Sequence, residues 1–397
     1  MASPANDDIP TFRIDLARPP ELRYVDVAAS FGPRIKTLGH VFDELLESML
    51  GSKWLASIAK FAAWLFLRRV HDGEQTREIK GFIDIAGVDL YLVVALNVFL
   101  DVMMSCTAGC VQVDTKHGEH QAAGSNLMHF RTLDWGLDPL RDILVILEYV
   151  DTSKDPDHVI ATSITYAGFV GVLTGIRENL SLSLNYRPIH LCDNWALRKH
   201  QCLVILGFRP AISSIIRSTF FSPQHTTCKN AANPSIVDMA RSIASIPTAP
   251  CYLTFSDGKK AVVVEKDLLS GRIRAADNFI VQTNHDSGHA MGCLPNGVSD
   301  DAQPATPHPD LWLADSSERM DVILEKWVDH SGQQDSSGGN RDATSGVWDI
   351  GTKPVAEENL RAWMRDDKIS NMYTHFACIM DPCTGTIRWV ERGPRLQ

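Results

Sequence analysis

The sequence lacks several features that would assign it to a specialised class of protein. It has no excess of positive charge, since its 397 residues give a formal net charge of −10. That balance argues against a nucleic-acid partner, because binding the phosphate backbone requires a basic face. The N-terminus has no cationic start followed by an apolar core, which is the pattern of a secretory signal. We therefore expect an intracellular protein, either cytoplasmic or peripheral to a membrane.

Metal-binding and disulfide patterns are also missing. The nine cysteines are scattered, form no CxxC pair and join no Cys/His quartet with zinc spacing. His117 and His120 lie three residues apart, but no third ligand is evident near them. Cys378 and Cys383 are close enough in sequence to form a disulfide, but only in an oxidising compartment. We expect free thiols, no metal and no cofactor.

One apolar run approaches the length of a bilayer span. It covers residues 86–105 and contains Asp89, Asn97 and Asp101. Because such polar residues are costly inside a membrane, the run predicts a buried or amphipathic helix. The composition, 44% apolar and 22% charged, is typical of a globular protein with one large or two ordinary domains.

The first hundred residues show helical periodicity. Residues 33–50 and 53–70 place apolar side chains at helical spacing. The second range contains Trp54, Phe61 and Trp64 and ends with two arginines. This pattern is typical of a helix that lies in a membrane interface. A helix packed on the rest of the protein would give the same pattern, and both interpretations stay open.

After Cys106 the pattern changes to short β-branched alternations, which predict strands. Asp257-Gly258 lies between two of them and predicts a hairpin turn. Helical periodicity returns between residues 191 and 246. The sequence thus predicts an α+β protein with a helical N-terminal part. Strands are expected at 144–150, 159–172, 180–186, 252–255, 261–265, 279–283 and 376–380, and surface loops at 295–310 and 330–346.

Residues 103–136 carry the most informative pattern. Cys106 stands at the end of the apolar run, before Thr107 and Ala108, and an apparent hairpin then ends in Arg131-x-x-Asp134. Taken alone, these residues are weak support for chemistry, because a cysteine in an apolar setting is usually an inert core residue.

Several such segments together resemble the acid ceramidase and N-acylethanolamine acid amidase family. In that family Cys-Thr-Ser begins the mature β chain, a hairpin returns through Arg-Asn-x-Asp-Phe-Gly, and further motifs follow in a fixed order. The segments here are similar to these motifs and occur in the same order. They are Pro20–Tyr24 (PELRY), Cys106-Thr107-Ala108, Arg131–Gly136 (RTLDWG), Tyr166–Gly175 (YAGFVGVLTG), Val281–Asp286 (VQTNHD) and Asp315–Met320 (DSSERM).

The resemblance implies an αββα sandwich of the N-terminal-nucleophile type. Residues 1–105 would form a helical α-subunit-like segment and residues 106–397 the β-subunit-like catalytic domain. The zymogen would cut itself between Ser105 and Cys106, and the two fragments would stay associated. The implied reaction is hydrolysis of a fatty-acyl amide of lipid metabolism, either an N-acylethanolamine or a ceramide, through a thioester, without metal or cofactor.

The resemblance also implies roles for individual side chains. Cys106 would be the nucleophile, and its own α-amino group, freed by the cut, would be the base. Asp134 would accept hydrogen bonds from the new ammonium, and Arg131 would favour the thiolate. Asn284 would donate to the oxyanion of the tetrahedral intermediate. Arg319, near an expected helix start at residues 316–318, would order the site or contact the polar head of the substrate.

Two departures from the family pattern matter. Tyr186 stands where the family has a glutamate, and a phenol supplies no negative charge at low pH. The relatives are lysosomal, whereas this sequence has no visible secretory signal, so a lysosome-like compartment is not expected. Cys110, four residues after Cys106, is a rival nucleophile, but it lacks the following threonine of the family.

Other functions remain alternatives. A cysteine acyltransferase or acylase of the same fold would act on a non-lipid amide. A non-catalytic, uncut homologue would only bind lipids. Trp64, Trp135 and Tyr166 would line an acyl channel or, as is commoner for aromatic residues, pack in the core. Residues 53–70 would provide a peripheral membrane contact.

Overall fold

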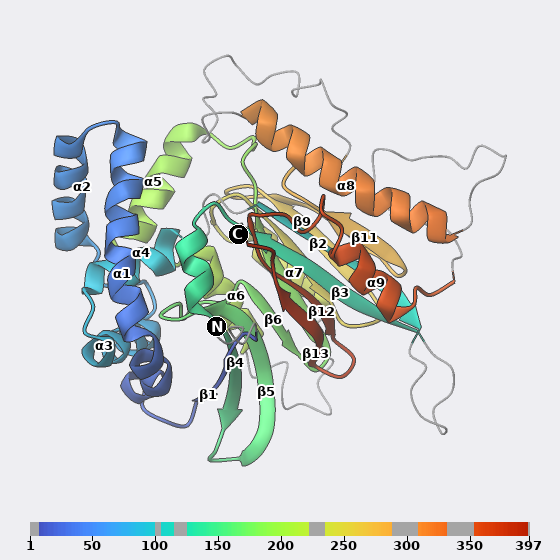
Figure 1. Cartoon of the computed structure of the whole chain (residues 1–397), viewed down its shortest axis with the longest axis horizontal. Helices are drawn as coiled ribbons and strands as arrows, with labels where there is room; N and C mark the ends of the chain where they lie inside the picture. The colour runs from blue at the N-terminus through green and yellow to red at the C-terminus, as the bar shows by residue number, and fades with distance from the viewer. Residues whose placement is uncertain are drawn as a thin grey trace, which may run out of the picture.

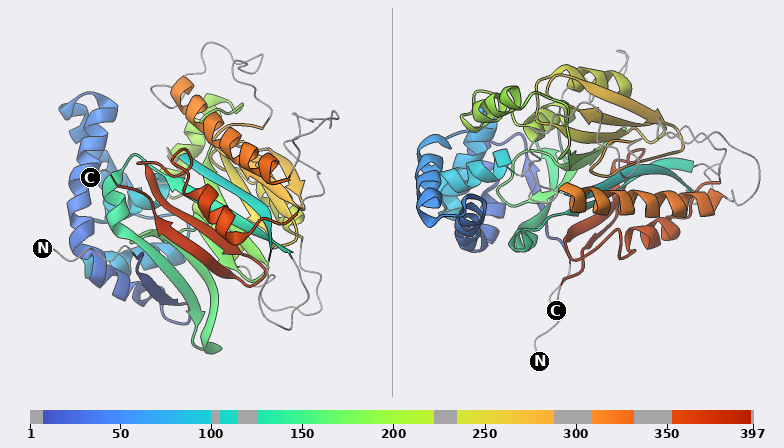
Figure 2. Two further views of the ribbon diagram at one scale, coloured as in Figure 1. Left: turned by 45° about the vertical axis from the view of Figure 1, so that its right-hand side comes forward. Right: turned by 90° about the horizontal axis from the view of Figure 1, so that it is seen from above.

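The computed structural model describes residues 8–99, 105–114, 125–221, 235–287, 309–331 and 353–395. Within them, two β-sheets lie face to face and helices cover their outer sides (Figures 1 and 2). The predicted αββα sandwich is therefore confirmed. His117, His120 and most of the two expected loops at 295–310 and 330–346 lie outside the described residues.

The part of the chain before Cys106, here called the N-terminal segment (residues 8–99), forms a helical lobe at one end of the sandwich (Figure 1, blue). It is mainly helical, as the sequence predicted, and it also contributes one strand, which pairs in parallel with a strand of the larger sheet. Its elements are β1 (Thr11–Asp15), η1 (Pro20–Leu22), α1 (Val25–Leu50), α2 (Lys53–Phe66), α3 (Gly73–Ala86) and α4 (Leu90–Phe99).

Both expected helices in this segment are present with different ends. The helix predicted at 33–50 is the C-terminal part of α1, which begins at Val25 and includes Pro33. The helix predicted at 53–70 ends at Phe66, because Leu67 leaves the helical conformation and is buried. Helix α4 forms within the apolar run, and none of the described helices is long and apolar enough to cross a bilayer.

The larger sheet has eight strands in the order β1-β4-β5-β6-β7-β8-β9-β10, all antiparallel neighbours except β1 and β4. The strand expected at 159–172 stops at Tyr166, because the chain turns at Gly168, which has φ +89°. The strands after β1 are β4 (Leu144–Asp151), β5 (Asp155–Tyr166), β6 (Thr174–Arg177), β7 (Leu180–Tyr186), β8 (Cys251–Ser256), β9 (Ala261–Lys266) and β10 (Gly271–Ala276).

The smaller sheet has five strands in the order β11-β2-β3-β12-β13. Its inner face packs on the larger sheet, where His129 of β3 lies within 2.9 Å of the hydroxyls of Ser181 and Ser183 on β7. The strands are β2 (Ser105–Asp114), β3 (Ser125–Asp134), β11 (Phe279–Gln282), β12 (Thr374–Asp381) and β13 (Thr386–Arg392).

The remaining helices complete the outer layers. Helix α7 packs on β9 and β10 of the larger sheet, while α8 and α9 pack on the smaller sheet (Figure 2). Helix α8 begins at Pro309, so the helix start expected at Ser316 is wrong. These helices, with the short η2 between β3 and β4, are η2 (Asp138–Ile143), α5 (Asn194–Ile205), α6 (Ile212–Phe220), α7 (Ile236–Ser245), α8 (Pro309–Ser331) and α9 (Glu357–Met364).

Candidate active site

Cys106 is the second residue of β2, a strand paired on both sides in the smaller sheet. Its side chain is completely buried and belongs to the core between the sheets. Burial raises the pKa of the Cys106 thiol, and the charge of Arg131 acts in the opposite direction. The thiol in the uncut chain therefore needs a base before it can attack a carbonyl.

Arg131 comes from β3, the neighbour of β2, and is also completely buried. Its Nη2 lies 3.5 Å from Cys106 Sγ, as expected for a residue that favours the thiolate. Two main-chain carbonyls hold the guanidinium: Nη1 donates to Leu173 O and Nη2 to Leu184 O, both at 2.7 Å. Because carbonyls carry no net charge, the positive charge of Arg131 is not neutralised by these contacts.

Asp134 ends the same strand, opposite Ser105 of β2. Three residues apart on a strand, Arg131 and Asp134 need an irregularity to converge, and a register shift between β3 and β12 occurs at this point. Thr374 donates to Asp134 Oδ1 at 2.6 Å, and Arg319 Nη1 lies 3.6 Å from Oδ2. Burial raises the pKa of Asp134 to about 6, against the lowering effects of Arg319 and Thr374.

Asn284 and Arg319 approach the nucleophile from the other side of β2. Asn284 Oδ1 accepts from the main-chain N–H of Cys106 at 2.8 Å and from Arg319 Nη2 at 3.2 Å. Asn284 Nδ2 donates to the carbonyl of Tyr186 at 2.7 Å. Asn284 thus holds the amide nitrogen of the bond expected to be cut, and its role as an oxyanion donor stays a prediction. Arg319 is ordered by Asp315 at 3.0 Å, one turn earlier on α8.

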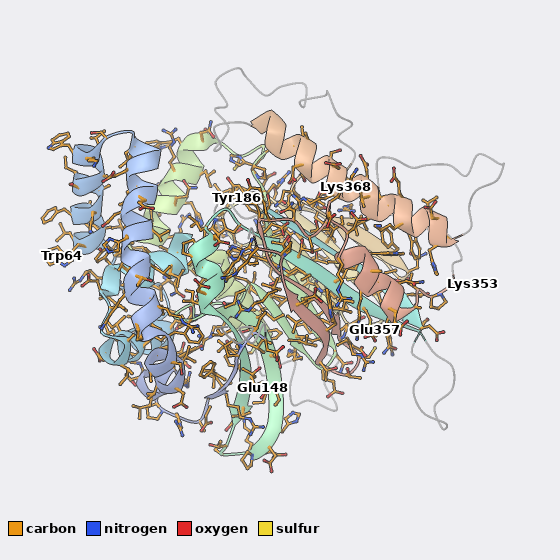
Figure 3. The ribbon with its side chains drawn as sticks, viewed as in Figure 1. Trp64, Glu148, Tyr186, Lys353, Glu357 and Lys368 are labelled. Atoms are coloured by element: carbon orange, nitrogen blue, oxygen red, sulfur yellow. The ribbon has the colours of Figure 1, made fainter. Side chains whose placement is uncertain are left out.

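Tyr186 ends β7 of the larger sheet, whereas Trp64 stands at the outer edge of the molecule (Figure 3). Burial raises the pKa of Tyr186 to about 12, so its phenol stays neutral at physiological pH. Trp64 is 51% exposed, so its expected place in a channel at Cys106 is wrong. Trp135 and Tyr166 are buried and form an edge-to-face pair, and for them the channel role stays a prediction.

Other polar residues complete the site and were not singled out from the sequence. Thr107 accepts from Arg319 Nη1 at 2.9 Å, and Ser316 accepts from Asn284 N at 2.8 Å. Asn185 Nδ2 donates to the carbonyls of Gln282 at 3.2 Å and of Cys106 at 3.5 Å. Thr107 and Ser316 lie within the resembling motifs and Asn185 directly precedes Tyr186, and these positions were the available signal.

Cys110 lies on the same strand but away from this cluster. It packs with Leu127, Ala261 and Ile280 in a separate apolar group, and burial raises the pKa of its thiol far above the usual range. Seven cysteines are described, and all are free, including Cys378 and Cys383. In the described ranges, no three His, Cys, Asp or Glu side chains gather as metal ligands.

The fold and the site together define a class of protein. A cysteine at the start of an inner strand of an αββα sandwich, flanked by charged and amide side chains, fits the N-terminal-nucleophile type of fold.

Comparisons with known proteins show which sequences the chain is similar to. Residues 7–71 match the family model described as the beta subunit of N-acylethanolamine-hydrolyzing acid amidase. The chain is 26% identical over 286 residues to an uncharacterized protein of Acanthamoeba polyphaga mimivirus, covering 71% of this chain and 80% of that one. It is 24% identical over 194 residues to acid ceramidase of Heterocephalus glaber and of Rattus norvegicus. These matches cover 45% of this chain and 46% of each ceramidase, so the chain spans just under half the length of those enzymes.

A solved structure of the Caenorhabditis elegans N-acylethanolamine-hydrolyzing acid amidase ortholog is 17% identical, covers 73% of this chain and 100% of its own, and gives a TM-score of 0.48. The chain is therefore similar, as a divergent sequence, to the acid ceramidase and N-acylethanolamine acid amidase family. The family model applies the name beta subunit to residues that precede Cys106, for which the resemblance suggested the α-subunit name.

Proposed function

We propose that the protein cuts itself between Ser105 and Cys106 and then hydrolyses a fatty-acyl amide with the freed cysteine. The observation that carries the proposal is the hydrogen bond from Cys106 N to Asn284 Oδ1, with Arg131 Nη2 beside Sγ. The amide nitrogen of the scissile bond and the attacking sulfur are thus both held by buried polar groups before any cut. The matched family model is described as a subunit, which supports a processed two-chain arrangement.

The first reaction would be an attack of Cys106 Sγ on the carbonyl carbon of Ser105. The carbon–nitrogen bond breaks, the nitrogen takes a proton and becomes the α-amine, and Ser105 remains bound to sulfur as a thioester. Water then hydrolyses the thioester to a carboxylate and a free thiol. Because Asn284 Oδ1 already faces this nitrogen, it would continue to accept a hydrogen bond from the amine.

The second reaction would repeat these steps on a substrate. The α-amine removes the proton of the thiol, and the thiolate attacks the amide carbonyl. The ammonium then protonates the leaving amine, which leaves an acyl thioester that water hydrolyses to a fatty acid. The carboxylate of Asp134 would stabilise the ammonium, and Arg131 the thiolate. Tyr186, which stands in place of the glutamate of the family, stays neutral. Asp134, with a pKa of about 6, is therefore the carboxyl group of the described site on which the pH dependence would rest.

A contact with a membrane would give such an enzyme access to lipid amides. Helix α2 supports this part of the proposal, because seven of its large apolar side chains are exposed. They are Trp54, Leu55, Ile58, Phe61, Trp64, Leu65 and Phe66. Arg68 lies against the ring of Trp64 at 5.9 Å, so an aromatic side chain and a cation occupy the same edge of the helix. That combination is typical of helices that lie in an interface.

Intact-mass analysis tests the proposal directly. We expect the 44.0 kDa chain to give two fragments, one of which begins at Cys106, after incubation between about pH 4.5 and about pH 8. Cys106→Ala should abolish both the cut and the release of fatty acid. Cys110→Ala is the matched control and should leave both unchanged, because Cys110 lies in a separate apolar group.

Three outcomes would contradict the proposal in different ways. A single uncut species at every pH points to a binding protein. Residual hydrolysis in Cys106→Ala points to Cys110. Acyl transfer to added hydroxylamine that exceeds fatty-acid release points to an acyltransferase.

A further inference from the structure

An asparagine of the N-terminal segment is inserted into a loop of the catalytic body. Asn97 of α4 is 4% exposed and interrupts an otherwise apolar run. Its Nδ2 donates to Gly168 O at 2.8 Å, and its Oδ1 accepts from Val170 N at 2.9 Å. The same Nδ2 donates to Val93 O of its own helix at 2.8 Å. Both ends of the amide are therefore bonded, and the side chain fixes the spacing of two loop residues.

A buried ion pair holds the same loop from a second helix of the segment. Arg217 of α6 donates to Val170 O at 2.6 Å. Glu78 of α3, which is completely buried, pairs with Arg217 at 2.7 Å. Gly168 packs so closely that a Cβ there would lie 3.2 Å from Phe82 of α3. The N-terminal segment thus contacts the loop directly at Gly168 and at Val170 N, and it reaches Val170 O through the Glu78–Arg217 pair.

The loop leads directly to the nucleophile. Three residues after Val170, Leu173 O accepts the 2.7 Å hydrogen bond from Arg131 Nη1. The second anchor of Arg131, Leu184 O, is tied to the first, because Leu184 N donates to Leu173 O at 2.9 Å. No carboxylate in the described ranges pairs with Arg131, so these two carbonyls set the place of its guanidinium beside Cys106 Sγ.

We infer that Asn97 is a positioning residue for the reaction: it acts through residues 168–173 to hold Arg131 against Cys106. The inference rests on the proposed function. It makes the N-terminal segment a working part of the site after the cut, because separation of the two fragments would release the loop that anchors Arg131. Asp134 and Arg319, the other charged groups near the sulfur, are held by Thr374 and Thr107 rather than by this loop, and they would keep their places.

The test measures the thiol itself. The rate at which iodoacetamide alkylates Cys106 is followed against pH by peptide mass in the intact chain, and the self-cut is followed in parallel. In Asn97→Leu we expect the apparent pKa of the Cys106 thiol to rise by about one unit, since a cation within about 4–6 Å lowers such a pKa by roughly 1–3 units. That rise lowers alkylation at a fixed pH about tenfold. Asn97→Asp, which keeps the acceptor for Val170 N but repels Gly168 O, should give a smaller rise.

The matched control is Ser214→Ala. Ser214 Oγ donates to Gln75 Oε1 at 2.9 Å, which is another buried hydrogen bond between α6 and α3 that does not touch residues 168–173. It should lower the melting temperature as the Asn97 variants do but leave the thiol pKa unchanged. An unchanged thiol pKa in folded Asn97→Leu and Asn97→Asp, or an equal rise in Ser214→Ala, would overturn the inference. If the wild type never cuts, the proposed function fails, yet the alkylation profiles still decide the role of Asn97.

Discussion

The surroundings of Cys106 and helix α2 distribute polar and apolar side chains in opposite ways. Around Cys106, charged and amide groups such as Arg131, Asp134 and Asn284 are at most 2% exposed. On α2, Ala56 is the buried side chain among the described residues of the helix, and Trp54 is 71% exposed. Folding alone favours neither arrangement, because buried polar groups lose hydration and exposed apolar groups gain no burial energy. Each region is therefore better explained by what it binds than by stability.

The two regions also differ in what a substitution should do. At Cys106 a change breaks a network in which almost every donor has a fixed acceptor, so effects on chemistry should be large. On α2 a change at an exposed apolar side chain removes little packing within the folded chain. The free energy of unfolding should therefore change little. Variants in each region can therefore separate catalysis from attachment.

The largest effect is expected for Asn284→Leu, which removes the acceptor for Cys106 N and the partner of Arg319. The rate of the self-cut should fall by about 10²–10³, comparable to the loss of one oxyanion-hole donor. Intact mass against time measures it. Asn126→Leu on β3, whose amide faces Asp381 instead, is the control. Equal rates for wild type and Asn284→Leu would mean that the buried network is only structural.

A smaller effect is expected for a double change on α2, Trp54→Ser with Phe61→Ser. Full burial of one large apolar side chain contributes roughly 1.5–3 kcal/mol, and an interface covers only part of each side chain, so removing two should weaken binding to lipid vesicles about tenfold. Co-sedimentation measures binding, and hydrolysis of a soluble amide should not change. Leu269→Ser, at a 65% exposed leucine of the catalytic body, is the control. If this control weakens binding equally, α2 is not the docking face.

The smallest effect is expected for Thr374→Val, a shift in pH dependence. Thr374 donates to Asp134 and lowers its pKa, which burial has raised to about 6. Activity that needs the Asp134 carboxylate should be lost as pH falls through that value. Without the donor the pKa rises, so the acid limb of the pH–rate profile should move to higher pH by less than about one unit. Activity that is lost as pH rises through this pKa, instead of as pH falls, would show that the active form of Asp134 is the protonated one.

Periodicity predicted the central strands well. Leu180–Tyr186 is a strand as expected, because leucines alternate with small polar residues along it, and it is buried on both faces. Strands β1, β6, β10 and β13 were not predicted, and they have little in common with that pattern. In β10, Gly271–Ala276 carries two arginines and lies at the sheet edge, so its pairing depends on β9 rather than on its own composition.

The main site residues were named from the order of motifs, and the structure brings Cys106, Arg131, Asp134, Asn284 and Arg319 together. Thr374 could not be found in this way. It is a single small polar residue 240 positions from Asp134, and it reaches the carboxylate through the register of β12 on β3. Asn97 was noticed only as a break in an apolar run, because its partners Gly168 and Val170 are main-chain groups that leave no mark in composition.

The pairing of strand β1 gives the expected cut a consequence for the larger sheet. It forms the edge of the eight-stranded sheet, paired with β4 from Thr11 to Asp15, yet it lies on the other side of Ser105 in the chain. A cut before Cys106 would thus leave one sheet shared between two polypeptides. Loss of the shorter chain would uncover the backbone of β4 along its whole pairing edge, and an open edge of this kind is a template for aggregation. The N-terminal segment therefore keeps the β4 edge of the larger sheet from pairing with other chains, in addition to its proposed role in the site.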